Sequence, residues 1–280
     1  MRMERNTCVH CRLGGRMEGD FTGKDVYGKH FAPKDYLKMY YSFSKEDGTQ
    51  ENRALTFYLQ KFHKTFTVDG VKGDTLIDIG SGPTIYQFLS SCGSFREIIA
   101  TDYTDQNREE IKRWLKKDPE AFDWSQVLKY VCELEGDREK WVEKGEKVRS
   151  TIRRVLKCDV TQVNPLAPLV VAQASCVTST FCLDSACKDV TTYLAALKNV
   201  GSLVKPGGHL VLLVALGASF YMVGQHPFFC LYLEKETVDR AVTEAGFDIL
   251  WSEGAKNSYS PIHSDCKTVY FLVAQKRIKV

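Results

Sequence analysis

The segment that decides the fold is Ile77-Asp-Ile-Gly-Ser-Gly-Pro83, a glycine-rich turn after a short apolar run. Glycine allows the backbone to turn sharply and to approach a bound ligand closely. Pro83 suits the first turn of a helix, where a backbone amide would have no partner. We therefore expect a strand that ends at Ile79, a ligand-binding turn, and a helix that opens near Pro83.

Outward from this turn, short apolar runs alternate with segments of helical periodicity. We expect strands at 75–79, 97–102, 155–160, 175–183, 209–216, 248–254 and 268–275, and helices that include 55–66, 105–117, 189–204 and 234–245. This alternation predicts an α/β, Rossmann-like fold with a seven-stranded, mostly parallel sheet and helices on both faces. No helical pattern separates the last two strands, so they should form an antiparallel C-terminal hairpin.

The N-terminal part of the chain precedes this pattern. Residues 1–16 lack periodicity, so we expect a disordered extension there and one domain over 17–280. Within that domain, 17–66 would form a helical lid and a helix, and 74–280 the core. The stretch 20–43 is rich in aromatic side chains, which either pack on the core or cover a site, and the pattern alone leaves both readings open.

Two further segments carry a local prediction. The span 133–154 is dense in alternating charge, so we expect a solvated helix there. The span 210–224 is the longest apolar stretch, but glycines and a serine interrupt it short of the roughly 18 residues of a membrane span. We interpret it as a buried strand plus a loop, with no membrane partner.

Charge and cysteine placement exclude other classes of protein. The net charge is +3 and the basic residues are spread along the chain, which argues against nucleic acid as a partner. Cysteines such as Cys158 and Cys230 lie in apolar runs, where free cysteine behaves as a small buried hydrophobe. Cys8 and Cys11 have the spacing of a zinc knuckle but no second pair follows, so we expect no metal. Without an apolar leader, we expect a cytoplasmic monomer.

Carboxylates at two strand ends point to the kind of ligand. Asp102 ends the strand after the glycine-rich turn, the usual place for a carboxylate that binds ribose hydroxyls. Ile85 stands where a dinucleotide-binding turn has its third glycine, so a tightly held pyrophosphate is not expected. Asp159, at the end of the third strand, can accept a hydrogen bond from an adenine amine. The alternative for Asp102 is an N-cap of the helix that begins near Asp105.

These segments, taken in order with Lys205-Pro-Gly-Gly208, resemble class I methyltransferases that use S-adenosylmethionine. More narrowly, the chain from about Met17 onward resembles the nicotinamide, indolethylamine and phenylethanolamine N-methyltransferase family. The motifs that carry this resemblance are Phe21-Thr-Gly-Lys-Asp25, Pro33-Lys-Asp-Tyr-Leu37, Gly80-Ser-Gly-Pro-Thr-Ile-Tyr86, Trp114-Leu-Lys-Lys117 and Val155-Leu-Lys-Cys-Asp-Val160. It implies S-adenosylmethionine as cofactor and a small-molecule acceptor, and it favours the lid reading of the aromatic residues.

The resemblance also implies a role for individual positions around the cofactor. Tyr36 and Tyr41 would cover the cofactor, and Tyr40 would close the substrate side. The other cofactor contacts would be Gly80, Ser81, Tyr86 and Thr180 at the methionine part, Asp102, Tyr103, Thr104 and Asn107 around the ribose, and Asp159 and Val160 at the adenine.

The acceptor side is where this sequence departs from the nicotinamide enzymes of the family. Their acidic residue after the fifth strand is Val214 here, and two of their serines are Ala218 and Cys230. A carboxamide left without partners costs about 1–3 kcal/mol per group, which disfavours nicotinamide. The stretch Ser179-Thr-Phe-Cys-Leu-Asp184 nevertheless looks more like the nicotinamide enzyme.

Catalysis by this family is an in-line methyl transfer, so the protein mainly positions the reactants and excludes water. We expect Tyr36 and Asp184 to be catalytic, because Asp184 could orient or deprotonate an amine. Its alternative role is a carboxylate at the N-terminus of the helix near Val190. Tyr221 and Tyr259 complete the expected substrate contacts.

The sequence predicts an N-methyltransferase for an aromatic or arylalkyl amine, or for nicotinamide or a related pyridine. Two alternatives stay open. The acceptor could be a thioether or another soft nucleophile, which the apolar residues at Val214, Ala218 and Cys230 would tolerate. The chain could also bind the cofactor without efficient catalysis.

Overall fold

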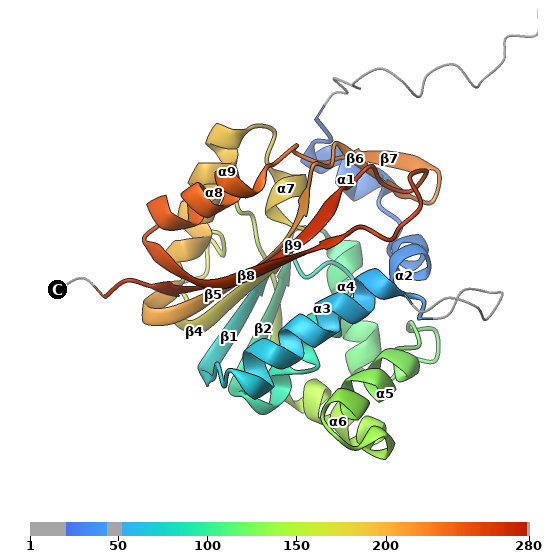
Figure 1. Cartoon of the computed structure of the whole chain (residues 1–280). Helices are drawn as coiled ribbons and strands as arrows, with labels where there is room; N and C mark the ends of the chain where they lie inside the picture. The colour runs from blue at the N-terminus through green and yellow to red at the C-terminus, as the bar shows by residue number, and fades with distance from the viewer. Residues whose placement is uncertain (1–20, 44–51, 279–280) are drawn as a thin grey trace, which may run out of the picture.

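One β-sheet forms the centre of the fold (Figure 1). The computed structural model describes residues 21–43 and 52–278, and within them seven strands pair in the order β3-β2-β1-β4-β5-β9-β8. Their bounds are β1 (Gly73–Ile79), β2 (Phe95–Asp102), β3 (Ile152–Lys157), β4 (Ala174–Thr180), β5 (Val204–Leu216), β8 (Phe247–Lys256) and β9 (Thr268–Lys276). β1 to β5 run parallel to one another, whereas β9 runs antiparallel to both β5 and β8. The predicted sheet and its antiparallel C-terminal pair are confirmed.

Helices cover both faces of this sheet. One face carries α3 (Arg53–His63), α4 (Asp105–Leu115), α5 (Ser125–Leu134) and α6 (Trp141–Thr151), and the other α7 (Leu183–Ala186), α8 (Val190–Ser202) and α9 (Lys235–Glu244). Successive side chains of a strand point to opposite faces. Leu76 of β1 accordingly packs in the core on the α3 side, and Ile77 in the core on the α8 side.

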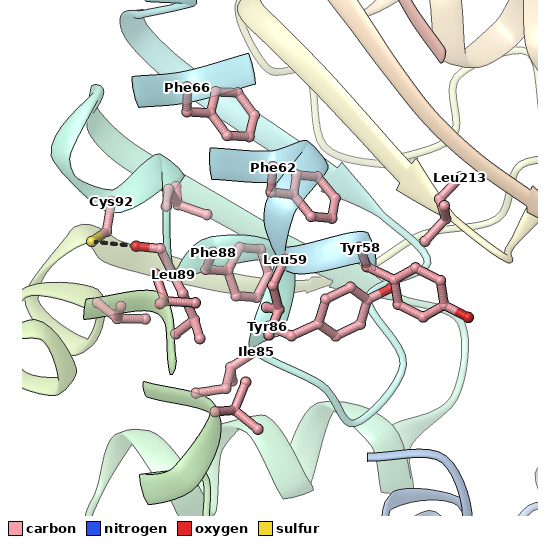
Figure 2. Close-up of a cluster of buried hydrophobic side chains, with 14 of the residues drawn as sticks. Tyr58, Leu59, Phe62, Phe66, Ile85, Tyr86, Phe88, Leu89, Cys92 and Leu213 are labelled. Atoms are coloured by element: carbon pink, nitrogen blue, oxygen red, sulfur yellow. Dashed lines mark hydrogen bonds between the residues drawn. The ribbon is translucent and has the colours of Figure 1, made fainter. Parts of the chain in front are cut away.

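The core on the α3 side holds the segment after β1 in place (Figure 2). Phe62 of α3 makes edge-on contacts with Phe271 of β9 and with Tyr86, at ring-centroid distances of 5.1 and 6.0 Å. Phe88 and Leu89 are fully buried in the same cluster. The chain that leaves the glycine-rich turn is therefore packed between α3 and the sheet.

No α-helix opens at Pro83, so that prediction is wrong. Only a 3-10 helix, η2 (Tyr86–Phe88), follows the turn. The reason is local: the Gln87 amide donates to the Asp78 carboxylate at 3.0 Å, and the Thr84 hydroxyl donates to the Ser81 carbonyl at 2.8 Å. Such side-chain bonds compete with the regular backbone bonds of a helix.

The predicted helix over 133–154 is also wrong as one element. The chain breaks at Gly136, which has φ +95°, and Asp137 then caps a 3-10 helix, η4 (Arg138–Lys140), before α6 begins. From Ile152 onward the residues belong to β3. That strand ends earlier than expected, because the Asp159 carboxylate accepts bonds from the Thr161 amide and hydroxyl and so forms a turn.

The N-terminal helices α1 (Lys24–His30) and α2 (Pro33–Tyr41) lie beside a small hairpin of β6 (Phe220–Val223) and β7 (His226–Phe229). The hairpin falls partly in the span that we expected to be a loop. Phe31 and Phe228 bury their rings against each other, 5.6 Å apart. The remaining short elements are the π-helical turn η1 (Lys64–Val68) and the 3-10 helix η3 (Ser91–Gly93).

Some predictions concern residues that the structure does not describe. The expected extension 1–16, with Cys8 and Cys11, lies outside the described residues. Among the helices of 21–43 and 52–278, none combines the length and the apolar character that crossing a bilayer requires.

Candidate active site

A cavity of about 620 Å³ opens at the carboxyl ends of the parallel strands. Ligands of doubly wound sheets bind at this edge, and small-molecule sites have volumes of roughly 300–1,000 Å³. All but two of the predicted site residues line the cavity. Those that do are Tyr36, Tyr40, Tyr41, Gly80, Ser81, Asp102, Tyr103, Thr104, Asn107, Asp159, Val160, Thr180, Asp184, Ala218, Tyr221, Cys230 and Tyr259.

The glycine-rich turn is held rigidly under the cavity. Gly80 and Gly82 have φ of +71° and +59°, values that favour glycine. Asp78, fully buried below the turn, accepts hydrogen bonds from the hydroxyls of Ser81 (2.6 Å) and Thr178. Burial raises the pKa of Asp78, and these donors partly offset the rise. The turn therefore presents backbone to the cavity from a fixed position.

Asp102 lies at the cavity end of β2 and is tied to both neighbouring segments. Its Oδ2 accepts from the Gly82 amide at 2.9 Å, and its Oδ1 accepts from the Thr104 amide and hydroxyl and from the Asn107 side-chain amide. Asn107 Oδ1 is buried and has no partner within the described residues. Since Oδ2 has room for a second donor, these two oxygens fit a pair of ligand hydroxyls.

The N-cap of α4 is Thr104, so the N-cap alternative for Asp102 is wrong. Oδ1 serves the start of α4 through Thr104, whose own side chain makes no capping bond to the helix. Oδ2 remains directed at the glycine-rich turn. Burial raises the pKa of Asp102, while the bonds from Thr104 and Asn107 oppose that rise.

Asp159 follows β3 at the far end of the cavity. Its Oδ1 accepts from Thr161, and its Oδ2 accepts from the Lys24 ammonium at 2.5 Å. Burial pushes the pKa of Asp159 up, but the bonds from Lys24 and Thr161 outweigh it, and the pKa lies below its usual range. The carboxylate is therefore ionised at neutral pH.

Tyrosines of α2 form the wall opposite the glycine-rich turn. The hydroxyls of Tyr36 and Tyr41 lie 3.3 Å apart, and Tyr41 stacks on Tyr86 at 5.1 Å. Tyr40 donates to the carbonyls of Met222 and His263. Burial raises the pKa of Tyr36 to about 12, so these phenols are neutral donors at physiological pH.

The other end of the cavity is an aromatic chamber with one buried carboxylate. Asp184 lies in α7, and not at the end of a strand as expected, because β4 ends at Thr180. Its Oδ2 accepts from the Ala215 amide at 3.0 Å, and burial raises its pKa to about 6. Tyr27 and Tyr221 hydrogen-bond to each other in the same chamber.

Two predicted residues lie outside the cavity lining. Val214 is buried on the α8 side of β5, so the expected substrate contact needs correction: the alternation of the strand brings Ala215 to the cavity instead. Tyr86 is buried behind Tyr41, with its hydroxyl unpaired in the described part of the chain. It supports the tyrosine wall from behind.

Several lining residues were not predicted from the sequence. They include Lys24 and Tyr27 of α1, Phe181 after β4, and Cys266 before β9. Lys24 lies inside one of the quoted family motifs, which was a usable signal. Phe181 also lies in a quoted stretch, 179–184, but its left-handed backbone conformation, with φ +52°, cannot be read from sequence.

The side chains of the described residues do not form a metal centre. Over 21–43 and 52–278, no group of three or more His, Cys, Asp or Glu side chains could hold a metal ion. The cysteines in these ranges are free thiols. The cavity offers backbone, hydroxyl, carboxylate and aromatic groups to a ligand.

Similar proteins and solved structures agree with this description. The chain is 54% identical to nicotinamide N-methyltransferase of Homo sapiens and 52% identical to indolethylamine N-methyltransferase of Oryctolagus cuniculus; each match covers 93% of this chain, with 98% and 99% of the relatives. It is 36% identical to phenylethanolamine N-methyltransferase of Homo sapiens, over 89% of each chain. The fold matches magnesium protoporphyrin IX methyltransferase from Synechocystis PCC 6803, with a TM-score of 0.57, 10% identity, and 90% and 94% of the two chains covered, in a structure with bound S-adenosylmethionine.

The fold is that of methyltransferases, and together with the matched relatives it defines an S-adenosylmethionine-dependent methyltransferase. The model of the NNMT/PNMT/TEMT family matches residues 19–277, and the chain belongs to that family. It is an enzyme, an N-methyltransferase. The residues present fit the cofactor, because Asp102 Oδ2 and the unpaired Asn107 Oδ1 offer acceptors where ribose hydroxyls would lie.

Proposed function

We propose that the acceptor is a small arylalkyl amine or an aromatic nitrogen heterocycle that binds in the chamber beside Asp184. The observation that carries this is a buried carboxylate among aromatic side chains, a setting that suits a compact cation or the positive charge that develops on a ring nitrogen as it is methylated. The named relatives of nearly equal identity act on nicotinamide and on indolethylamine, so overall identity does not choose between these acceptors. Ala218 and Cys230 lack the oxygen partners that a carboxamide needs, which favours acceptors other than nicotinamide.

We place the cofactor across the strand ends. Asp102 and Asn107, with Tyr103 and Thr104 beside them, would hold the ribose hydroxyls. Asp159 and the backbone of Val160 would hold the adenine. Gly80, Ser81 and Thr180 would hold the methionine part. Tyr36 and Tyr41 would close this end of the cavity from the α2 side.

The chemistry is a displacement in which the bound cofactor supplies a methyl group to the acceptor nitrogen. The residues of this chain orient the two reactants and exclude water, which can supply most of the rate. A pyridine-type nitrogen attacks with its free lone pair. A protonated amine must first release a proton, and the ionised Asp184 carboxylate accepts it. Tyr36 remains neutral and closes the wall beside the transfer path.

An acceptor panel tests this proposal. We expect methylated products, identified by mass, from arylalkyl amines such as tryptamine and phenylethanolamine and from quinoline, with lower kcat/KM for nicotinamide. A product only from dimethyl sulfide would favour the soft-nucleophile alternative instead. No product from any acceptor, with normal cofactor binding, would mean a binding protein without efficient catalysis.

The Asp184→Asn variant separates the two acceptor types. Asparagine still accepts from the Ala215 amide, so the chamber should keep its shape. For an arylalkyl amine we expect kcat/KM to fall about 100-fold at neutral pH, since base catalysis contributes roughly 10²–10⁴. For quinoline we expect less than about a threefold change. Equal losses for both acceptors would contradict the role of Asp184 as a base.

Asp184→Asn should lower activity toward amines, but it should raise the stability of the folded protein at high pH. The pKa of Asp184 rises from 3.8 to about 6 on folding, so between these values the folded state binds the extra proton and stability decreases as pH increases. Above pH 6 the ionised group costs about 3 kcal/mol. We expect the Asn variant to melt at a higher temperature than the wild type at pH 8, and at a similar temperature at pH 4. Calorimetry at the two pH values measures the difference.

We further propose that the enzyme works as a cytoplasmic monomer without a nucleic-acid partner. The modest net charge and the free thiols of the described residues support this. Light scattering with and without added RNA would test the oligomeric state and the nucleic-acid part, and cell fractionation the compartment.

A further inference from the structure

Helix α1 lies across the cavity between two flanking residues, Thr22 and Phe31, that are buried. We call residues 21–31 the strap. No residue of α1 itself is fully buried, and yet Lys24 and Tyr27 line the cavity. A segment with few buried contacts opens locally at a low cost in free energy. Aromatic packing of Tyr27 and Phe31 on Phe228 anchors the C-terminal end of the strap, and polar contacts hold the rest of it.

These contacts reach both ends of the cavity. At the adenine end, the Lys24 ammonium donates to Asp159 Oδ2 at 2.5 Å and to the Thr161 hydroxyl at 3.0 Å. One turn later, the Tyr27 hydroxyl bonds to Tyr221 in the acceptor chamber.

Three further hydrogen bonds tie the strap to its surroundings. Gln106 of α4, next to the ribose-binding residues, donates to the carbonyls of Tyr27 and Gly28 at 3.2 and 3.1 Å. The Phe229 amide donates to the Thr22 hydroxyl at 2.8 Å. The strap thus crosses from the adenosine end to the hairpin above the acceptor.

Lys24 binds the same carboxylate, Asp159, that we propose as the adenine contact. Asp159 Oδ1 already serves Thr161, so an adenine amine would join Lys24 on Oδ2, where the second lone pair is free. The pair is partly shielded, with the side chains 42% and 20% exposed for Lys24 and Asp159. Lys24 also lies over the Tyr103 ring, 5.3 Å from its centroid. One ammonium therefore joins the strap to two residues that border the nucleoside.

We propose that Lys24 is a positioning residue that fastens the strap over the bound cofactor through Asp159, so that the cofactor leaves only when this ion pair opens. The inference rests on the placement of adenine at Asp159 proposed above. Because Tyr27 belongs to the same helix, release of Lys24 also loosens the wall of the acceptor chamber. Cofactor release and acceptor access are thereby coupled through one short helix.

The Lys24→Met variant tests this with S-adenosylhomocysteine alone, without any acceptor. Methionine keeps an unbranched apolar stem and removes the charge. We expect the dissociation rate of S-adenosylhomocysteine to increase about fivefold, the factor that corresponds to a partly exposed ion pair. Backbone amides of the strap should also exchange faster in the complex. Lys24→Arg should restore both values.

Lys29→Met is the matched control, because Lys29 lies on the exposed side of the same helix and makes no ion pair with the described residues. Salt at about 1 M should accelerate dissociation from the wild type and not from Lys24→Met, since screening removes the same interaction. If Lys24→Met and Lys29→Met have equal dissociation rates and equal amide exchange, the proposal is overturned. Slower dissociation from Lys24→Met also overturns it, because Lys24 would then compete with the adenine.

Asp159→Ala, which removes both acceptor oxygens, tests the underlying placement separately in the Lys24→Met background. If Asp159 binds adenine, the second substitution weakens S-adenosylhomocysteine binding further, even though no ion pair remains. If the second substitution changes nothing, the adenine placement is wrong, whatever the strap does. The two failures are thus distinguishable by the same binding measurement.

Discussion

Asp102→Ala is expected to weaken cofactor binding by about 100-fold or more while the protein stays folded. The carboxylate accepts from the Gly82 amide, from both donors of Thr104 and from Asn107. Bonds to a charged acceptor contribute about 1.5–3 kcal/mol each, and donors left without a partner cost a similar amount. Alanine removes the ribose acceptor and also frees the turn and the start of α4 from each other.

Calorimetric titration with S-adenosylhomocysteine measures this loss, with thermal melting as the check on folding. Asp102→Asn is the matched control, because it keeps one carbonyl oxygen in the same place. We expect it to bind more weakly than the wild type and more tightly than Asp102→Ala. Near-normal binding by a folded Asp102→Ala protein would refute the ribose placement.

Gly80→Ala is expected to have the second large effect, on both stability and cofactor binding. A Cβ at position 80 would lie 2.2 Å from Cys182 Sγ and 2.4 Å from Cys182 Cβ. The Cβ atom of Cys182 is fixed to the backbone, so a change of rotamer cannot move it away from the added methyl group. The left-handed φ of +71° adds about 1–2 kcal/mol. We expect a loss of several °C in Tm and little remaining binding.

Gly82→Ala is the control for this prediction. Position 82 has a similar φ of +59°, but a Cβ added there would meet no atom within 4 Å. It therefore measures backbone strain without the collision. The double variant Gly80→Ala with Cys182→Gly should recover much of the difference, since it removes the colliding atoms. If Gly80→Ala and Gly82→Ala melt at the same temperature, close packing against Cys182 is not what requires glycine at position 80.

Much of the fold was predictable because its signals are local and periodic. The apolar runs of β1, β2 and β5 and the glycine-rich turn identified the sheet and the edge where ligands bind. The ends of the helices and strands were harder to predict, because hydrogen bonds from polar side chains determine where each element ends. Gln87 and Thr84 replace a helix by a 3-10 turn, and Asp159 ends β3 early.

The residues of the candidate site were likewise predicted only in part. Residues within motifs, such as Asp102 and Asp159, were placed at the cavity by their position at strand ends. Val214 was assigned by likeness to relatives, whereas the two-residue period of β5 brings Ala215 to the cavity. Lys24 was missed although it lies in a quoted motif, because its partner is 135 residues away and the motif does not reveal that contact.

The position of β9 also has a consequence for the order in which the chain can assemble. Among the strands that the structure describes, β8 pairs with β9 alone, and β9 pairs with the edge of β5. Until residues 268–276 have been synthesised, the nascent chain carries two unpaired strand edges, on β5 and on residues 247–256. Such edges recruit other chains and promote aggregation. A chaperone that shields these edges on the ribosome would therefore raise the yield of folded enzyme without altering the native state.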